Sequence, residues 1–307
     1  VKPPYDIPID NNPVGSYRRT FNLPANWDGK QIFINLDGVK TAFYLWINGV
    51  KVGYSEDYKL AAEFDITKYV KKGENVIALQ VFTWADSSYL ESQDMIRYSG
   101  IERGIYLYAT PTTSVIDYKV SSNLSNSYRD GAFELNLWVK NYNTDKGLHA
   151  RYQSYSVNVQ MLDAAGKKIF EDEQKINVLN TFKNTINFKK EIPNVRTWSA
   201  EIPYRYKLFI TLKDSEGKIL QVIPQHVGFR SIEIKGSDVL VNGKRVFFKG
   251  VNRHEAHPTK GHTLSFADME KDMEMMKKLN VNAVRNSHYP PHPYWMELCD
   301  KYGLYVV

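Results

Sequence analysis

Cysteine is nearly absent from this sequence. Of the 307 residues, Cys299 is the single cysteine. One thiol excludes an internal disulfide and a cysteine-based zinc cluster. Because Cys299 lies among the apolar residues of an expected helix, we interpret it as a buried structural thiol rather than a nucleophile.

Long apolar runs are absent as well. No stretch is long and apolar enough to span a membrane, and no signal peptide is visible at the start. The chain begins with Val1 rather than Met, in a Pro-rich segment. We therefore expect residues to precede it, and the missing signal leaves the compartment open: we expect a soluble protein, cytoplasmic or periplasmic.

The sequence also has no long run of Lys and Arg. Its 40 basic residues exceed its 34 acidic residues, for a net charge of +6, but they are scattered along the chain. This scatter argues against a nucleic-acid partner. What is plentiful is aromatic side chains, 13% of the residues with 21 Tyr. Aromatic rings suit half-buried strands and also stack on sugars, so the enrichment does not decide between the two.

The length predicts two or three domains, and residues 1–110 have the pattern of an all-β domain. Strands are expected over 31–36, 42–47, 50–54, 75–82 and 104–109. Asn48-Gly49 lies between two of these strands and predicts a two-residue hairpin, because both residues tolerate positive φ. Many short strands with Gly-rich turns at this size predict a jelly-roll β-sandwich.

Residues 111–230 predict a second all-β domain. Its clearer strands are expected over 133–139, 154–162, 185–188, 208–212 and 219–223. About seven strands in roughly 100 residues are typical of an immunoglobulin-like sandwich. Nothing in this region has the pattern of a catalytic site.

The pattern changes in residues 231–307, where strands and helices alternate. Short strands at 232–234 and 239–241 lead into a strand over 245–251, and Ser265 is placed to cap a helix. Residues at helical spacing predict one buried face on that helix: Phe266, Met269, Met273, Met276 and Leu279. A strand over 281–285, a helix ending at Gly303 and a strand over 304–307 follow. This order predicts parallel βα units, the incomplete start of a (β/α)8 barrel.

Two of these strands end in polar, ring-bearing residues. The first ends in Asn-Arg-His-Glu at 252–255, and the second in Arg-Asn-Ser-His at 285–288. The ends of neighbouring parallel strands lie at the same rim, about 4.8 Å apart. His254 and His288 could therefore converge on one ligand, where imidazole and guanidinium groups can bond sugar hydroxyls and stabilise developing charge.

Other interpretations of these residues remain open at this point. His254 and His257 could be a zinc pair, but they lie on a turn and no third ligand is evident. Glu255 between two histidines resembles a metalloprotease motif only superficially, because that motif needs a helix. His292, next to Pro293, is more simply a residue of a helix start.

A polar loop over 84–103 interrupts the strands of the first domain. It holds Asp86, Glu91, Asp94, Arg97 and Arg103. Loops carry function disproportionately, but the simpler interpretation is a solvated loop in which Arg97 or Arg103 pairs with an acid.

Three separated motifs carry a resemblance to a known family: Gly-Val-Asn-Arg-His-Glu-Ala-His-Pro at 250–258, Arg-Asn-Ser-His-Tyr-Pro at 285–290 and Leu-Cys-Asp-Lys-Tyr-Gly-Leu-Tyr-Val-Val at 298–307. Together with Ser-Tyr-Leu-Glu-Ser-Gln-Asp-Met at 88–95 and Ala-Phe-Tyr-Leu-Trp-Ile-Asn-Gly at 42–49, they closely resemble bacterial β-galactosidases of glycoside hydrolase family 2. The similarity covers nearly the whole chain, more weakly from 125 to 200.

The resemblance implies roles for individual residues. His254 and His288 match residues that contact galactose and support the transition state. Asp94 matches a carboxylate that binds the sugar and helps to hold a sodium ion, so the loop over 84–103 would reach into the barrel mouth. Arg285 matches a residue of the active-site rim, and His257 also falls on the motif as a substrate-binding residue.

The resemblance further implies a retaining β-galactosidase that hydrolyses terminal β-D-galactosides. Such enzymes use two glutamates, one acid/base and one nucleophile, with carboxyl groups roughly 5–5.5 Å apart. In the family both glutamates, and the main magnesium ligands, come later in the barrel. We therefore expect magnesium and sodium in the full-length enzyme, and no activity from these 307 residues by themselves. The relatives are often oligomeric, which leaves a homo-oligomer open.

Two alternatives stay in view. A β-glucuronidase or β-mannosidase shares the architecture, although Ser-Gln-Asp-Met at 92–95 and His-Glu-Ala-His-Pro at 254–258 argue against both. A non-catalytic carbohydrate-binding protein would instead use the jelly roll as its binding domain.

Overall fold

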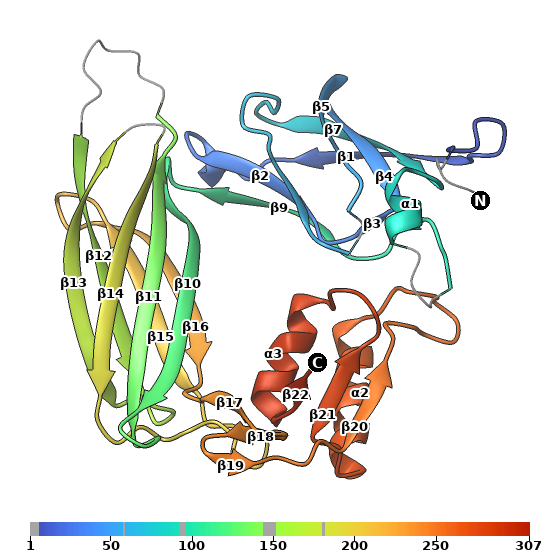
Figure 1. Ribbon diagram of the computed structural model, residues 1–307. Coiled ribbons are helices and arrows are strands. Elements are labelled where there is room, and N and C mark those ends of the chain that lie inside the picture. The colour runs from blue at the N-terminus through green and yellow to red at the C-terminus, as the bar shows by residue number, and fades with distance from the viewer. Residues whose placement is uncertain (1–5, 58, 92–95, 144–151, 180–181) are drawn as a thin grey trace. The chain divides into compact units, whose positions relative to one another are not determined.

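A computed structural model describes residues 6–57, 59–91, 96–143, 152–179 and 182–307 (Figure 1). The chain divides into two compact units. The first consists of Val1–Ala109, Gly250–Glu297 and Val306–Val307, and the second of Thr110–Lys249 and Leu298–Tyr305. Each unit therefore contains segments that are distant in sequence.

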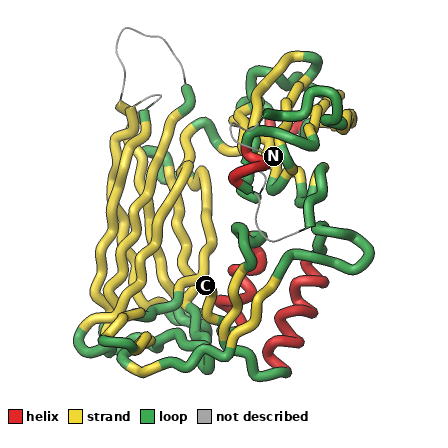
Figure 2. The backbone as a smooth tube through the Cα atoms, turned by 45° about the vertical axis from the view of Figure 1, so that its right-hand side comes forward, coloured by secondary structure: helices red, strands yellow, loops and turns green. Residues whose placement is uncertain are grey.

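The N-terminal part of the first unit is a β-sandwich, whose strands are yellow segments near the N label in Figure 2. Its larger sheet has the order β1-β7-β4-β5, the second sheet has the order β6-β2-β9, and β3 pairs with β8. The bounds are β1 Val14–Asn22, β2 Gln31–Leu36, β3 Val39–Lys40, β4 Ala42–Ile47, β5 Val50–Ser55, β6 Ala62–Asp65, β7 Glu74–Phe82, β8 Gly100–Ile101 and β9 Ile105–Thr110. Two short helical turns, η1 (Ala25–Trp27) and α1 (Ser87–Leu90), connect strands.

The predicted hairpin of this sandwich is confirmed. Asn48 and Gly49 have φ of 51° and 81°, and Ile47 faces Val50 in the register of β4 and β5. Both φ values lie in the left-handed region, where Asn and Gly carry little steric penalty. The same strands supply the core: the side chains of Leu36, Leu45 and Ile47 are fully buried between the sheets.

The C-terminal part of the first unit is parallel. β20 (Gly250–Arg253) pairs in parallel with β21 (Ala283–Asn286), and β22 (Tyr305–Val306) follows β21 in the sheet. Helix α2 (Phe266–Lys278) lies between β20 and β21 in the chain. Helix α3 (Pro293–Tyr302) lies between β21 and β22, and its residues from Leu298 onward belong to the second unit. The single strand expected over 245–251 is wrong. β19 (Lys244–Arg245) pairs antiparallel with β18 (Asp238–Val241), whereas β20 takes a parallel partner, so the chain changes sheets between them.

Helix α2 begins as predicted but buries less than predicted. Ser265 and Asp268 form a reciprocal capping box at its N-terminus. Met269 and Met273 are buried, whereas Phe266 is 58% exposed and Leu279 is 69% exposed. Helical periodicity identifies which face is apolar, but it does not tell which turns of that face a neighbour covers.

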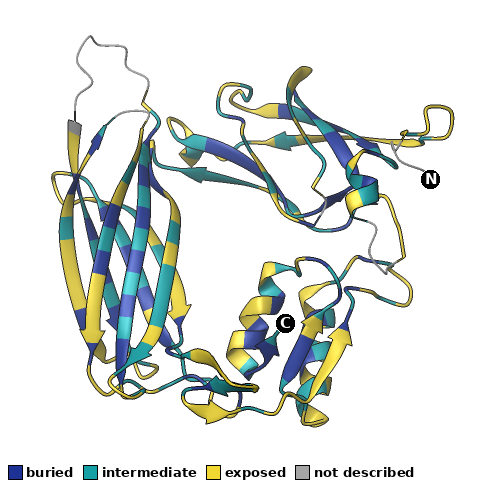
Figure 3. Cartoon of the chain, in the orientation of Figure 1, coloured by how far each residue is buried: buried dark blue, intermediate teal, exposed yellow. Residues whose placement is uncertain are grey.

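The second unit is dominated by a sandwich of long strands. One sheet has the order β10-β11-β14 and the other β13-β12-β15-β16. The bounds are β10 Thr113–Ser125, β11 Asp130–Asn141, β12 Tyr152–Leu162, β13 Lys168–Leu179, β14 Lys183–Ile192, β15 Tyr206–Lys213 and β16 Ile219–Val227. Burial alternates along β11, as the dark-blue bands of Figure 3 show. Side chains at every second position, such as Leu135 and Leu137, therefore point into the core between the sheets.

Two smaller features complete the second unit. β17 (Ile232–Lys235), β18 and β19 form a three-stranded antiparallel sheet. Cys299 is a buried cysteine, in agreement with its interpretation as structural. None of the helices in the described part of the chain has the length and apolar character that a membrane crossing needs.

Candidate functional site

The two histidines expected to converge lie side by side. His254 directly follows β20, and His288 lies two residues after β21. Their ring centroids are 5.7 Å apart and the rings are nearly perpendicular, at 89°. Val251 and Val284 are register partners in the parallel pair, so the two strands end at one rim. The sheet therefore presents two half-buried imidazoles at the same place, and their contact with a substrate stays a prediction.

Side chains along these strands alternate between the sheet face that packs against the helices and the opposite face. Arg253 is 7% exposed, stacks on the Trp295 ring at 3.8 Å, and donates from Nε to Asp272 at 3.0 Å. Successive strand residues point to opposite faces. Its neighbour Asn252 and the register partner of Asn252, Arg285, are both exposed. Arg285 is thus accessible near the strand end, as a rim residue would be.

The other predicted site residues take different positions. His257 lies in a turn, where its Nδ1 accepts from the Thr259 backbone N–H at 3.2 Å. Asp94 lies outside the described residues, so its predicted contacts with sugar and sodium stay predictions. His292 is a helix-start residue as expected, because its Nδ1 accepts from the Tyr294 backbone N–H at 3.1 Å at the beginning of α3.

Next to the histidine pair is a cluster of buried charges, here called the charge cluster and made of Lys59, Glu102, Arg103 and Glu255. Lys59 Nζ lies 2.7 Å from Glu102 and 3.8 Å from Glu255. Arg103 Nη2 lies 2.7 Å from Glu255 Oε2. Each of these side chains is at most 6% exposed. Two cations and two carboxylates balance, which is the condition for burying charge without a large penalty.

Glu255 stays ionised in this cluster. Burial by itself would raise the pKa of its carboxyl group, but the charge and hydrogen bond of Arg103, the backbone N–H of His292 and the Lys59 charge together hold the pKa below its usual value. A permanently ionised carboxylate is a poor general acid. Glu255 is therefore suited to organising its surroundings rather than to donating a proton.

Several of these residues were missed by reasoning from sequence. Arg103 was expected to pair with an acid, but its partner Glu255 is 152 positions away. Lys59 and Glu102 had no signal beyond their residue types. Tyr289 follows His288 in the motif at 285–290, and its hydroxyl accepts the backbone N–H of Glu255 at 2.8 Å.

A metal site near the histidine pair would need several ligating side chains close together. Among the described residues, no three or more His, Cys, Asp or Glu side chains gather in a group that could hold a metal ion. The zinc pair considered for His254 and His257 thus lacks a third ligand there. The expected magnesium and sodium ions stay predictions, since Asp94 lies outside the described residues.

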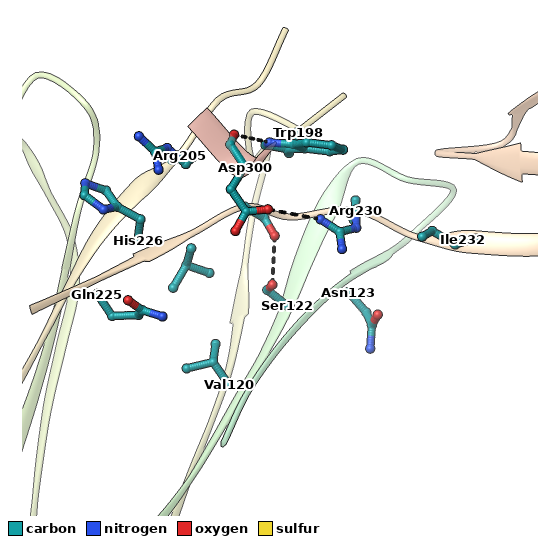
Figure 4. Close-up of a pocket in the computed structure, with 12 residues that line it drawn as sticks. Val120, Ser122, Asn123, Trp198, Arg205, Gln225, His226, Arg230, Ile232 and Asp300 are labelled. Carbon is teal, nitrogen blue, oxygen red and sulfur yellow. Dashed lines mark hydrogen bonds and ion pairs between the residues drawn. The ribbon is translucent and has the colours of Figure 1, made fainter. Parts of the chain in front are cut away.

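A hollow of about 480 Å³ lies in the second unit, lined by sandwich residues and Asp300 (Figure 4). Trp198 donates from Nε1 to the Asp300 carbonyl at 2.8 Å, and the Arg230 guanidinium lies over the Trp198 ring at 4.9 Å. Arg230 also lies 3.9 Å from the Asp300 carboxylate. These contacts fasten residues 298–305 to the sandwich. None of the predicted site residues that the structure describes is among those that line the hollow.

Fold and site together define a class: two β-sandwich domains followed by parallel βα units that carry polar residues at their strand ends. Three family descriptions match consecutive parts of the chain. Residues 3–111 match "Glycosyl hydrolases family 2, sugar binding domain", 113–230 match "Glycosyl hydrolases family 2", and 232–307 match "Glycosyl hydrolases family 2, TIM barrel domain". The chain therefore belongs to glycoside hydrolase family 2, and the predicted fold class is confirmed.

Similar proteins of known name include β-galactosidases. The chain is 42% identical over 308 residues to a β-galactosidase of Priestia megaterium, with 100% of this chain and 29% of that protein covered. It is 42% identical over 307 residues to a β-galactosidase of Halalkalibacterium halodurans, again covering 100% and 29%. The chain thus spans 29% of the length of these relatives.

Solved structures agree on the fold. A Bacteroides uniformis β-glucuronidase superposes with a TM-score of 0.88 at 23% identity, covering 95% of this chain and 35% of that chain. A β-glycosidase from Bacteroides vulgatus has a TM-score of 0.81 at 27% identity, covering 96% and 36%. The first of these likenesses concerns the fold alone.

Proposed function

We propose that the protein containing these residues is a retaining β-galactosidase that hydrolyses terminal β-D-galactosides. The observation that supports this most is the perpendicular pair of His254 and His288 at adjoining strand ends of a family 2 barrel segment. The 42% identity to β-galactosidases along the whole chain supports galactoside as the substrate.

In this proposal the two histidines bind rather than cleave. Their ring nitrogens hydrogen-bond hydroxyls of the galactose and stabilise charge that develops in the transition state. Arg285, exposed at the rim, and His257 and Asp94 are the further substrate-binding residues of the proposal. The acid/base and the nucleophile are two glutamates, as the family resemblance implies, and they supply the two carboxyl groups that retaining chemistry uses. We place neither role on Glu255.

The proposal extends to ions and partners of the whole protein. Sodium would be bound in part by Asp94, and magnesium by residues outside the described set. A homo-oligomer is proposed on the strength of the family resemblance. Both ions depend on residues that the structure does not describe, so the two histidines carry the test of the proposal.

The test compares hydrolysis of nitrophenyl β-galactoside, β-glucuronide and β-mannoside by the whole protein. We expect the galactoside to be strongly preferred. His254→Ala and His288→Ala should each lower kcat by about 100-fold, the usual effect of removing one transition-state hydrogen bond. The control is His226→Ala, an exposed histidine of the second unit, which should change kcat by no more than about twofold.

Other outcomes would replace the proposal. Preference for the glucuronide or mannoside would assign the chain to the corresponding activity of the family. Absence of hydrolysis, together with saturable galactose binding in calorimetry, would favour a carbohydrate-binding protein. Unchanged kcat in both site variants would remove the histidines from the mechanism.

A further inference from the structure

The charge cluster joins segments that are distant in sequence but belong to the same compact unit. Glu102 and Arg103 lie in the turn between β8 and β9 of the jelly roll, and Lys59 lies between β5 and β6. Glu255, which pairs with Lys59 and Arg103, lies in the barrel segment directly after His254. The cluster thus links the jelly roll to the residue that follows the first histidine of the site.

Glu255 is held from three directions. Its Oε2 accepts from Arg103 at 2.7 Å, its Oε1 accepts from the backbone N–H of His292 at 2.6 Å, and its own N–H donates to the Tyr289 hydroxyl at 2.8 Å. Tyr289 directly follows His288 in the chain. One hydrogen bond therefore connects the residue after His254 to the residue after His288.

Arg103 is itself firmly anchored. Its Nη1 donates to the Lys59 carbonyl at 2.7 Å, and its Nη2 also donates to the Pro290 carbonyl at 2.8 Å. Its backbone N–H donates to the Gly38 carbonyl at 3.2 Å in the jelly roll. A planar guanidinium used in this way fixes both the distance and the orientation of its partners.

The Tyr289 ring completes the arrangement. Lys59 Nζ lies 4.5 Å from its centroid, and the His254 ring lies 6.1 Å from it. The Tyr289 ring face thus contacts the Lys59 ammonium group, and its hydroxyl accepts a hydrogen bond from the Glu255 backbone N–H. These contacts, with the hydrogen bond from the Glu255 N–H, tie together the segments that carry the two histidines.

We propose that Arg103, Glu255 and Tyr289 are positioning residues that hold the His254 and His288 rings in their working geometry. The inference rests on the proposed function, and it gives the jelly roll a part in shaping the barrel site through Arg103. None of the three touches the reacting atoms in this proposal. Their effect is on the placement of the histidines, and misplacement of a catalytic contact by about 1 Å can lower a rate about 100-fold.

The test uses the whole protein with Glu255→Gln and the milder Tyr289→Phe, which removes a single oxygen. We expect kcat on the galactoside to fall by about 100-fold and about 10-fold respectively, with KM changed by less than about threefold, because ground-state contacts survive. The matched control is Asp130→Asn. Asp130 is also a buried carboxylate that accepts from an arginine, Arg129, and from a backbone N–H, that of Asn194, but it lies in the second unit.

A merely structural role predicts a different result. Glu255→Gln and Asp130→Asn would then both lower the thermal midpoint, and neither would change kcat at temperatures well below it. Tyr289→Phe guards against failure of the glutamine variant to fold. If kcat of Tyr289→Phe and of folded Glu255→Gln stays within about twofold of the wild type, the inference is overturned.

Hydrogen exchange supplies a readout that does not depend on the reaction. Amides of residues 254–257 and 287–292 should exchange faster in Tyr289→Phe and Glu255→Gln, and at the wild-type rate in Asp130→Asn. Unchanged exchange in these segments would overturn the inference. If the wild type hydrolyses none of the three glycosides, the proposed function fails, and exchange alone decides whether the three residues hold the histidine segments.

Discussion

At the scale of single residues, Glu255 is a buried carboxylate in the charge cluster. It is 4% exposed, and its carboxylate has a partner on each oxygen. Removing one member of a buried, paired set leaves an uncompensated charge behind. Replacing Glu255 should therefore be felt in stability as well as in the geometry of the site.

The pH dependence of this effect follows from the lowered pKa of Glu255. The unfolded chain has the ordinary value of 4.5, and the folded value lies below it. The folded state therefore holds the proton less tightly than the unfolded state. The stabilisation is fully present above pH 4.5 and is lost as the pH falls through the folded pKa.

We predict that Glu255→Gln lowers the free energy of unfolding by about 3 kcal/mol at neutral pH. The difference from the wild type should shrink as the pH falls below 4.5. Thermal unfolding at a series of pH values measures it. Asp28→Asn is the control, because the Asp28–Lys72 pair is exposed and should contribute little at any pH. A difference that grows in acid would contradict the assigned direction of the pKa.

At the scale of elements, helix α2 depends on its N-terminal cap. The Ser265 hydroxyl accepts from the Asp268 N–H at 3.2 Å, and the Asp268 carboxylate accepts from the Ser265 N–H at 2.9 Å. Hydrogen bonds from the Ser265 side chain and backbone hold the pKa of Asp268 below its usual range. The cap satisfies backbone donors that the first helical turn leaves without partners.

We predict that Ser265→Ala destabilises the protein by about 1 kcal/mol, the usual loss for a serine cap. Amides of the first turn of α2 should exchange faster with solvent. Lys271→Ala, an exposed position on the same helix, is the control and should be neutral or slightly stabilising. Equal effects of the two substitutions would show that the cap contributes nothing measurable.

At the scale of the whole molecule, the described residues contain the histidine pair and the charge cluster next to it. Retaining hydrolysis needs two carboxyl groups roughly 5–5.5 Å apart. Glu255, which follows His254, is already engaged by Arg103 and by the His292 N–H. It therefore cannot act as the nucleophile without breaking its ion pair with Arg103.

We predict that a purified polypeptide of residues 1–307 does not hydrolyse nitrophenyl β-galactoside above background. The whole protein serves as the positive control, and circular dichroism checks that the polypeptide has folded. Turnover well above background by the folded polypeptide would contradict the placement of both catalytic glutamates elsewhere.

The sequence by itself determined the features that depend on neighbouring residues. Asn48-Gly49 predicted a hairpin, Ser265 predicted a helix start, and the alternation of strands and helices predicted parallel strand ends that bring His254 and His288 together. Each rests on local backbone preferences or on a fixed periodicity. The expected single strand over 245–251 failed because the choice of partner strand is not local.

The tertiary structure alone decided how those strand ends are held. Arg103 and Glu255 are 152 positions apart, and no local rule selects one acid among many for an arginine. The same holds for Lys59, whose burial beside Tyr289 depends on the path of the chain. A charge becomes buried only when segments from different parts of the sequence exclude water together, and that is a property of the folded chain.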